Sequence, residues 1–266
     1  MLTIDTSKCI GCQTCVYECP SGALAEADGK INFIQPRCNY CGHCLAACPR
    51  DAIIIDGDGY FYEDVEEFHF EKPATPYQIR SLIMLRRSVR EYSDEEVTDD
   101  QVLKILEAGK YSPTARNLQG NMFLIVKSED EREKLLRTAA EYINKKGDAV
   151  MDEMPGLGQF YKLKYKRYIE DNEDNFFYCA PVIIFVFADN DLDGAIAAAN
   201  MGFMANAQGL GYCFAQSPTE IFDDPEIRKM YDIPDNKKCV LTLLVGYPEA
   251  SYFCSVPRKD PEIIWK

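Results

Sequence analysis

Eight cysteines in the first 48 residues are the side chains whose type and spacing most directly indicate chemistry. They form two runs with the same spacing, C-x2-C-x2-C-x3-C, and a proline follows the last cysteine of each run. The two runs are Cys9, Cys12, Cys15 and Cys19, and Cys38, Cys41, Cys44 and Cys48. Dense cysteines in a chain that carries no secretory signal are typical of metal binding. The repeat therefore indicates two metal centres held by two similar halves.

This spacing is that of bacterial two-cluster ferredoxins, in which the fourth cysteine of each run binds the cluster of the other run. We therefore expect two [4Fe–4S] clusters, the first held by Cys9, Cys12, Cys15 and Cys48 and the second by Cys38, Cys41, Cys44 and Cys19. Because each half supplies a ligand to the other, the clusters should lie close enough for electron transfer between them. His43 is expected beside a cluster or in solvent rather than as a ligand.

Zinc and disulfides are the alternative uses of these cysteines. Zinc sites also contain C-x2-C pairs, but three closely spaced cysteines in each run would crowd a single tetrahedral ion. Disulfides need an oxidising compartment, and the start Met-Leu-Thr-Ile-Asp lacks the basic and apolar regions of a secretory signal. The sequence contains no run of 18 apolar residues, so no transmembrane helix is predicted. We expect a cytoplasmic protein.

The overall charge narrows the classes of partner. The net charge is −14 and the sequence pI is near 4.7, which disfavours nucleic acid and anionic membrane surfaces because both bind Lys- and Arg-rich proteins. Hydrophobic residues make up 47% of the 266 residues. The chain can therefore form a small domain and a larger one with its own core.

A change of composition after Ile55 divides the chain. Acidic residues dominate the following stretch, and Pro73 and Pro76 bracket a short extended segment. We expect a two-cluster ferredoxin domain over 1–58, an acidic linker over 59–77 and a second domain over 78–266. The acidic run is interpreted as a solvated face; its alternative is a docking patch for a basic electron donor.

The second domain should alternate helices and buried strands. Periodicity predicts helices over 78–87, 129–146 and 191–209, and strands over 122–126, 182–188 and 239–246. Thr98 and Gln101 form a capping box for a further helix that ends near Gly109. Buried strands separated by helices predict the α+β class. No G-x-G-x-x-G follows a strand and no Walker A loop is present, which disfavours a Rossmann dinucleotide site.

Motifs in this domain together resemble the nitroreductase family of FMN-dependent flavoproteins. They are, in order, Arg86-Arg87-Ser88-Val89-Arg90-Glu91-Tyr92, the run from Ser112 to Gln119, the run from Gly209 to Ala215, and the weaker Pro257-Arg258-Lys259. Each alone has an ordinary explanation, such as pairing of the arginines with Glu91 and Asp94. Their order and spacing over residues 78–260 carry the resemblance. It implies a nitroreductase-like α/β sandwich that binds FMN rather than FAD.

The resemblance also implies roles for individual residues. Arg86, Arg87 and Ser88 would hold the FMN phosphate and ribityl chain, with Arg258 and Lys259 completing the phosphate clamp. Arg90 would lie at the N1–C2 edge of the flavin, where a guanidinium stabilises the anionic reduced ring. Backbone groups around Ala215 and Gln216 would face the N5 edge. No protein side chain is expected as the catalytic residue, because flavin N5 carries the chemistry.

The family resemblance further implies a homodimer whose partner chain completes the flavin site. Pro113, Thr114, Ala115 and Asn117 would reach the flavin of the other protomer. The chain departs from the family where many members carry an aromatic residue after this motif, because it has Gly120-Asn121. The small residues of the 191–209 helix would suit close helix contacts at such an interface, or an ordinary tightly packed core.

Two other features have competing interpretations. Tyr161, Tyr165 and Tyr168 share one helical face in the variable 147–178 segment, and either pack in the core or form a lid over the flavin. The remaining cysteines are expected to be ordinary buried residues. They are Cys179, Cys213, Cys239 and Cys254.

The expected function is an FMN- and iron–sulfur-dependent oxidoreductase. The clusters would pass single electrons to FMN, which would reduce a small organic acceptor such as a nitroaromatic, quinone, enone or flavin. The electron donor would be a ferredoxin or another redox protein. One alternative is an NAD(P)H-dependent reductase with the clusters as outlet, and another is a non-enzymatic electron-transfer or redox-sensing protein.

Overall fold

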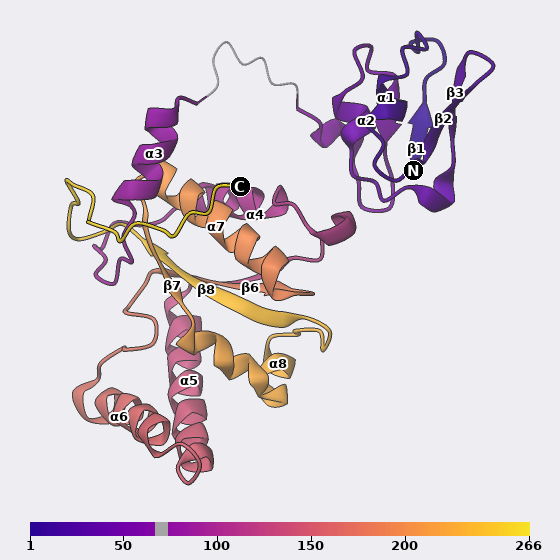
Figure 1. Cartoon of the computed structure of the whole chain (residues 1–266). Coiled ribbons are helices and arrows are strands. Elements are labelled where there is room, and N and C mark those ends of the chain that lie inside the picture. Colours follow the sequence, from indigo (N-terminus) through magenta and orange to yellow (C-terminus); the bar gives the residue numbers. More distant parts are fainter. Residues whose placement is uncertain (67–73) are drawn as a thin grey trace. The chain divides into compact units, whose positions relative to one another are not determined.

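The computed structural model describes residues 1–66 and 74–266 (Figure 1). Contacts divide the chain into two compact units: Met1–Pro73 with Thr114–Leu118, and Ala74–Pro113 with Gln119–Lys266. The acidic linker expected over 59–77 lies partly outside the described residues, and its described beginning contains a short 3-10 helix, η2 (Tyr62–Asp64). Each unit is described by itself below.

The first unit consists of two two-stranded antiparallel sheets and short helices. β1 (Leu2–Ile4) pairs with β4 (Ile53–Ile55), and β2 (Leu24–Ala27) pairs with β3 (Lys30–Phe33). The helices are α1 (Thr14–Tyr17), the 3-10 helix η1 (Gln35–Arg37) and α2 (His43–Ala46). Cys15 and Cys44 lie in one small core with the strand residues Leu2, Leu24, Ile53 and Ile55. The cysteine repeat is therefore part of the core of this unit.

The second unit is built on one four-stranded antiparallel sheet. Its strands are β5 (Met122–Val126), β6 (Val182–Ala188), β7 (Gly211–Ala215) and β8 (Lys238–Gly246), in the order β5-β6-β8-β7. Every residue of β6 is at most 1% exposed, as expected for a strand that is covered on both faces. The strands over 122–126 and 182–188 match their predicted bounds. β7 was not predicted as a strand, because its five residues follow the predicted 191–209 helix and were interpreted only as part of the motif from Gly209 to Ala215.

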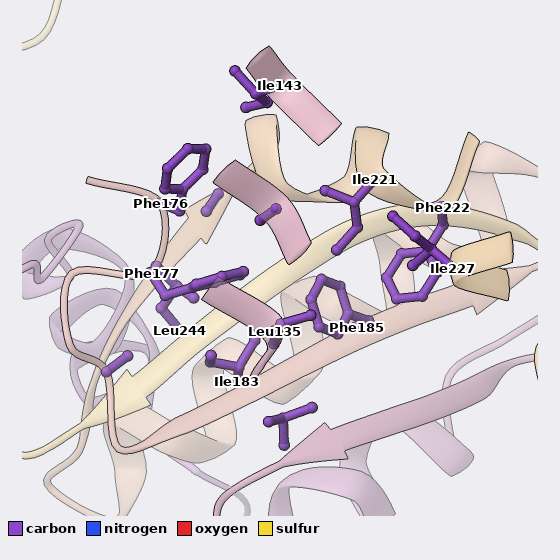
Figure 2. Packing of buried hydrophobic residues seen from close by; sticks show 14 of the residues in the cluster. Leu135, Ile143, Phe176, Phe177, Ile183, Phe185, Ile221, Phe222, Ile227 and Leu244 are labelled. Carbon is purple, nitrogen blue, oxygen red and sulfur yellow. The ribbon is translucent and has the colours of Figure 1, made fainter. Parts of the chain in front are cut away.

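Helices cover both faces of this sheet (Figure 1). On one face lie α3 (Pro76–Leu85), α4 (Asp99–Lys110) and α7 (Asp191–Ala207). On the other lie α5 (Glu129–Val150), α6 (Pro155–Asp171), the 3-10 helix η4 (Ser217–Asp223) and α8 (Pro225–Met230). Figure 2 shows the core of this second face, where the rings of Phe185 and Phe222 meet edge to face with centroids 4.9 Å apart. The sandwich expected for this domain is confirmed.

The helix starts follow local capping chemistry. Thr98 accepts a hydrogen bond from the Gln101 backbone N–H at 3.2 Å, and the Gln101 side chain accepts one from the Thr98 N–H at 3.0 Å. The predicted capping box of α4 is thus confirmed. Thr75 and Gln78 form a second capping box at the start of α3. None of the described helices is both long enough and apolar enough to span a bilayer.

The small residues of α7 serve close packing within the chain. A Cβ atom at Gly202 would lie 2.5 Å from the Tyr212 ring of β7, and Ala198 and Ala205 are fully buried in the same core. The tyrosine face of α6 is also packed: Tyr161 is 4% exposed, and Tyr165 and Tyr168 pack against the core beside it. In both cases the core-packing interpretation agrees with the observed burial.

Candidate functional site

The cysteines of the first unit surround two separate cavities. Cys9, Cys12, Cys15 and Cys48 line one cavity, together with the apolar side chains of Ile4, Ile10, Ile31 and Ile53. Cys19, Cys38, Cys41 and Cys44 line the other, together with Leu2, Leu24, Phe33 and Ile55. The fold therefore brings together the two crossed sets of four thiols expected from the spacing. His43 lines the second cavity.

Backbone geometry explains how such closely spaced cysteines reach one cavity. The residue before each short helix adopts a left-handed conformation, with φ of 61° at Gln13 and 78° at Gly42. Gly11 and Gly42 have positive φ, a region in which glycine has no steric penalty. Gln13 and Gly42 lie between the second and third cysteines of their runs, and Gly11 lies between the first and second. The first three thiols of each run line the same cavity.

The fourth cysteine of each run receives a matching backbone hydrogen bond. The Ala23 N–H donates to Cys19 Sγ at 3.1 Å, and the Ala52 N–H donates to Cys48 Sγ at 3.3 Å. The Tyr40 N–H donates to Cys38 Sγ at 3.4 Å. Such donors stabilise negative charge on sulfur, and in iron–sulfur sites they raise the reduction potential.

Burial and hydrogen bonding move the thiol pKa values in opposite directions. Burial raises the pKa of Cys44 to about 11, and burial, aided by the neighbouring thiols, also raises the pKa of Cys15. At Cys19, burial raises the pKa, but the bonds from Ser21 and Ala23 outweigh it and the net shift is downward. The protein surroundings of the third cysteines by themselves thus disfavour the thiolate form.

The described residues contain no group of three His, Cys, Asp or Glu side chains close enough to hold one metal ion. A [4Fe–4S] cluster has no such requirement, because each thiolate binds a different iron at a different corner. The donor set of four thiols around an apolar cavity is the one that such clusters use. The residues present in each cavity therefore fit a cluster.

In the second unit, arginines gather around one cavity of about 360 Å³. Arg86, Arg87 and Arg258 line it from the end of α3 and from the C-terminal segment, and α7 and β7 contribute the aromatic side chains of Phe203, Tyr212 and Phe214. Within residues 1–66 and 74–266, no carboxylate forms an ion pair with any of these arginines. In a chain of net charge −14, this uncompensated positive cavity fits an anionic group such as a phosphate.

Arg87 differs from the other two arginines of the cavity. Its guanidinium donates to the backbone carbonyl oxygens of Met84 at 2.9 Å and Arg86 at 2.6 Å. It also donates to the carbonyl oxygen of Cys254 at 2.9 Å. Arg87 therefore joins the end of α3 to the C-terminal segment that carries Arg258, and Arg86 and Arg258 are better placed to receive an anion.

The arginine motif runs alongside β7. The Val89 N–H donates to the Tyr212 carbonyl at 3.0 Å, and Ser88 forms an isolated parallel bridge with Tyr212. Two glycines make this approach feasible. Gly209 turns the chain with φ of +80°, and a Cβ atom at Gly211 would lie 2.6 Å from a methyl group of Val89. The arginine motif and the Gly209–Ala215 motif therefore pack against each other, and the absence of a side chain at Gly211 leaves the space that Val89 occupies.

Arg90 lies further along the same segment. Its guanidinium donates to the Ser88 carbonyl at 3.4 Å and lies over the ring of Tyr178, 5.5 Å from the centroid. Neither Glu91 nor Asp94 pairs with it within the described part of the chain. The interpretation that local carboxylates neutralise the motif does not match this arrangement. Tyr178 was missed by sequence reasoning, because 88 positions separate it from Arg90.

The remaining predicted flavin residues are not all at the arginine cavity. Ala215 ends β7 and is 9% exposed, and Gln216 follows it and lines a different cavity. Lys259 is exposed in the C-terminal segment. Thr114 and the 3-10 helix η3 (Ala115–Asn117) group with the first unit. There the Asn117 amide donates to the backbone carbonyls of Asn39 and Tyr40, each at 3.0 Å.

The unusual Gly120 has a packing explanation. Lys237 donates to the Gly120 carbonyl at 2.5 Å and to Asp189 Oδ1 at 2.6 Å. A Cβ atom at Gly120 would lie 1.9 Å from Asp189 Oδ2. The ion pair therefore occupies the space that a side chain at this position would need, and this accounts for the departure from the family pattern.

The remaining cysteines were expected to be buried, and for two of them this was wrong. Cys213 is buried in β7 and Cys239 is partly buried, whereas Cys179 and Cys254 are exposed. Cys179 lies in the turn before β6 and Cys254 in the C-terminal segment. Both positions are adjacent to apolar sequence but outside the sheet, and apolar neighbours in the sequence do not guarantee burial in the fold.

Comparison with known proteins identifies both units. Residues 83–247 match the model of the nitroreductase family, and residues 1–49 match the model of the 4Fe-4S dicluster domain. A putative NAD(P)H nitroreductase of Bacillus subtilis is 25% identical over 177 residues, which cover 64% of this chain and 84% of that protein. An iodotyrosine deiodinase of Daphnia pulex is 26% identical over 226 residues, which cover 74% of this chain and 71% of that protein.

Other similarities concern one unit or the fold alone. One component of an ion-translocating oxidoreductase complex of Methanosarcina acetivorans is 44% identical over 45 residues, and the match spans 17% of this chain and 17% of that protein. The crystal structure of a Bacteroides fragilis nitroreductase with bound FMN superimposes with a TM-score of 0.61 at 23% identity. It covers 71% of this chain and 99% of that one. This second similarity is one of fold.

A helix-covered antiparallel sheet of the nitroreductase fold and a cysteine-rich iron–sulfur domain in one chain define the class of iron–sulfur oxidoreductases. The chain belongs to the nitroreductase family and carries an N-terminal iron–sulfur domain. Membership of this family makes the chain an oxidoreductase.

Proposed function

We propose that this oxidoreductase reduces a small organic acceptor at FMN with electrons relayed from two [4Fe–4S] clusters. The acceptor belongs to the nitroaromatic, quinone, enone or flavin class. The observation that carries the proposal is the presence, in one chain, of two crossed four-cysteine cavities and an uncompensated arginine cavity in a nitroreductase-family domain. A cluster exchanges single electrons, and FMN supplies the conversion between one-electron donors and a two-electron acceptor.

In this proposal the arginines bind FMN along the segment beside β7. Arg86 and Arg258 hold the phosphate in the cavity that they line. Arg87 keeps the C-terminal segment in place through its bond to the Cys254 carbonyl, while its other two bonds go to the end of α3. Ser88 contacts the ribityl chain. Arg86 and Arg90 are four residues apart, about 13 Å in an extended segment, and this separation supports a position of Arg90 at the ring. There its charge favours the anionic reduced flavin at the N1–C2 edge.

The first unit holds the clusters and protects them. Cys9, Cys12, Cys15 and Cys48 bind one cluster, and Cys19, Cys38, Cys41 and Cys44 bind the other. The apolar walls of the two cavities shield the buried Cys15 and Cys44 from water. The N–H donors at Cys19 and Cys48 stabilise the charge of those thiolates. Thiol ligands persist in a reducing compartment, which supports a cytoplasmic location.

A homodimer would complete the flavin site. Pro113, Thr114, Ala115 and Asn117 would approach the flavin of the second protomer, and the backbone around Ala215 and Gln216 would face the N5 edge, with Lys259 near the phosphate. Large apolar side chains are exposed on α3 and on the C-terminal segment. Two of them are Ile83, 52% exposed, and Trp265, 91% exposed. Exposed apolar groups on neighbouring segments support contact with a second copy of the chain.

A second candidate donor is NAD(P)H. It is favoured by two relatives whose names include NAD(P)H nitroreductase, one of Bacillus subtilis and one of Methanothermobacter thermautotrophicus, which are 25% and 26% identical to this chain. In that case the pyridine nucleotide would deliver hydride directly to FMN, and the clusters would serve as an outlet to another protein.

An anaerobic absorbance titration distinguishes these donors. The holoprotein is titrated with NADH or NADPH, and then with a reduced ferredoxin. If the nucleotides leave flavin and clusters oxidised and the ferredoxin bleaches both, the clusters are the inlet. Prompt bleaching of the flavin by a nucleotide would instead assign the clusters as an outlet. A protein that is reduced by either donor but turns over none of the four acceptor classes would contradict the reductase function.

A further inference from the structure

The turn before β6 holds two adjacent residues in a strained conformation. Tyr178 has φ of 54° and Cys179 has φ of 52°. Side chains other than glycine rarely adopt this left-handed region, and bulky ones are the least tolerated. In the described residues the only other non-glycine neighbours that share positive φ are Arg116 and Asn117. A strained tyrosine persists only where the surrounding structure fixes it.

One carboxylate fixes this turn. Asp174 Oδ1 accepts hydrogen bonds from the backbone N–H groups of Phe176 at 3.1 Å and Phe177 at 2.8 Å, and Oδ2 accepts one from the Cys179 N–H at 2.8 Å. Phe176 and Phe177 are each 1% exposed in the core (Figure 2). The turn is therefore held from one side by the carboxylate and from the other by two buried rings.

The result of this constraint is the position of the Tyr178 ring at Arg90. The guanidinium carbon lies 5.5 Å from the ring centroid, within the range of a cation–π interaction. A carboxylate in this place would also hold Arg90, but it would neutralise the charge. An aromatic face holds the guanidinium and leaves its full positive charge, and the described part of the chain supplies no carboxylate partner for Arg90.

We propose that Tyr178 is a positioning residue that holds the charged Arg90 guanidinium toward the flavin, and so makes the protein bind reduced FMN more tightly relative to oxidised FMN. This inference rests on the proposed function, which places Arg90 at the N1–C2 edge of the ring. The reduced ring is anionic at that edge and the oxidised ring is neutral. A fixed, uncompensated guanidinium therefore discriminates between the two redox states, whereas a mobile one does so less.

The test is the ratio of the dissociation constants for oxidised and reduced FMN. Apoprotein is titrated with each form anaerobically, and the ratio is checked against the flavin midpoint potential. Tyr178→Leu removes the aromatic face and keeps an apolar side chain. We expect it to lower the preference for reduced FMN about two- to fivefold, the size of one cation–π interaction. Tyr178→Phe keeps the ring and should retain the wild-type ratio.

Matched variants separate positioning from packing. Tyr165→Leu makes the same change in α6, away from Arg90, and should leave the ratio unchanged. Arg90→Gln should lower the ratio by itself, and Tyr178→Leu should add nothing in that background. If Tyr178→Leu does not fold, Asp174→Asn provides the second variant. It removes the acceptor for the Cys179 N–H, loosens the turn and should lower the ratio in the same direction.

The outcomes distinguish this inference from the proposed function. If the wild-type protein does not bind FMN, or if Arg90→Gln leaves the ratio unchanged, the proposed flavin site is wrong. If Arg90→Gln lowers the ratio but neither Tyr178→Leu nor Asp174→Asn does, the positioning role of Tyr178 is overturned while the flavin site stands.

Discussion

At the residue scale, the three arginines that line the cavity of the second unit differ in what their guanidinium groups contact. Arg87 donates to three backbone carbonyls. Arg86 and Arg258 line the cavity, and neither has a carboxylate partner in the described residues. An unpaired guanidinium in a cavity is free to bind an anion, and one that already joins two segments is not. We therefore expect Arg86 to contribute directly to FMN binding.

Replacement of Arg86 by Gln should weaken FMN binding. The loss of a charge-assisted hydrogen bond to the phosphate corresponds to about 1.5–3 kcal/mol, or about a 10- to 100-fold higher dissociation constant. Fluorescence titration of apoprotein with FMN measures it. Arg80→Gln removes the same charge from an exposed position of α3 and should change the affinity little. Equal losses in both variants would show that only the overall charge matters.

Gly120 offers a second test at this scale. In Gly120→Ala the new methyl group would overlap with Asp189 Oδ2, and the pair with Lys237 would have to move. We expect a loss of about 1–3 kcal/mol in the free energy of unfolding, measured by denaturant titration. Gly156→Ala is the control, because nothing lies within 4 Å of a Cβ atom there, and alanine should stabilise α6 by up to about 1 kcal/mol.

At the scale of elements, a polar network joins α5, α6 and η4. Lys146 of α5 pairs with Glu220 of η4 at 3.0 Å, and the Tyr161 hydroxyl of α6 donates to the same carboxylate at 2.9 Å. The side chains of Lys146 and Glu220 are 25% and 32% exposed. Because three elements share one carboxylate, its loss should loosen their packing more than the loss of a surface ion pair would.

Glu220→Gln should therefore lower the free energy of unfolding by about 1–2 kcal/mol at neutral pH. Glu170→Gln, which removes a surface pair with Lys166, should change it by less than about 0.5 kcal/mol. Denaturant unfolding of both variants measures the difference. A value for Glu220→Gln as small as that of the surface control would mean that the network does not stabilise the packing of these elements.

The pH dependence of this network follows from Lys146. Burial lowers the pKa of Lys146, but the bond and charge of Glu220 outweigh burial, so the net pKa is raised above 10.5. A raised folded-state pKa contributes stability that is complete below the unfolded-state pKa and is lost as the pH rises through the folded-state value. The contribution of Lys146 should thus be constant from pH 7 to pH 9 and decline only in strong alkali.

At the scale of the whole molecule, the crossed cysteine sets join the two halves of the first unit. Cys48 belongs to the second run but lines the cavity of the first, and Cys19 does the reverse. If each cavity holds a cluster, neither half can bind its cluster without the other. Loss of the clusters should therefore unfold this unit while the second unit, with its own sheet and core, retains its transition.

Cys48→Ser tests the crossing. It should reduce the iron content from about eight to about four atoms per chain, and the remaining cluster should have the electron paramagnetic resonance spectrum seen in Cys9→Ser. Cys254→Ser changes an exposed cysteine outside both cavities and should retain all the iron. If the spectrum of Cys48→Ser instead matched that of Cys38→Ser, the ligands would not be exchanged between the runs.

The sequence by itself determined the features that depend on neighbouring residues. The cysteine spacing predicted which four thiols meet, the capping box at Thr98 predicted the start of α4, and apolar runs predicted β5 and β6 with their bounds. These signals are local, because caps, turns and strand alternation involve residues within a few positions of one another. The order of short motifs carried the family resemblance in the same way.

Only the tertiary structure decided which distant residues act together. It placed the Tyr178 ring at Arg90 and directed the Arg87 guanidinium to backbone carbonyls. It also showed that the pair of Asp189 and Lys237 fills the space that a side chain at position 120 would need. It also made β7 a strand, because Gly211–Ala215 pairs with β8. Such contacts depend on how the sheet and helices pack, which brings residues far apart in the chain within a few ångströms, and no local pattern records that packing.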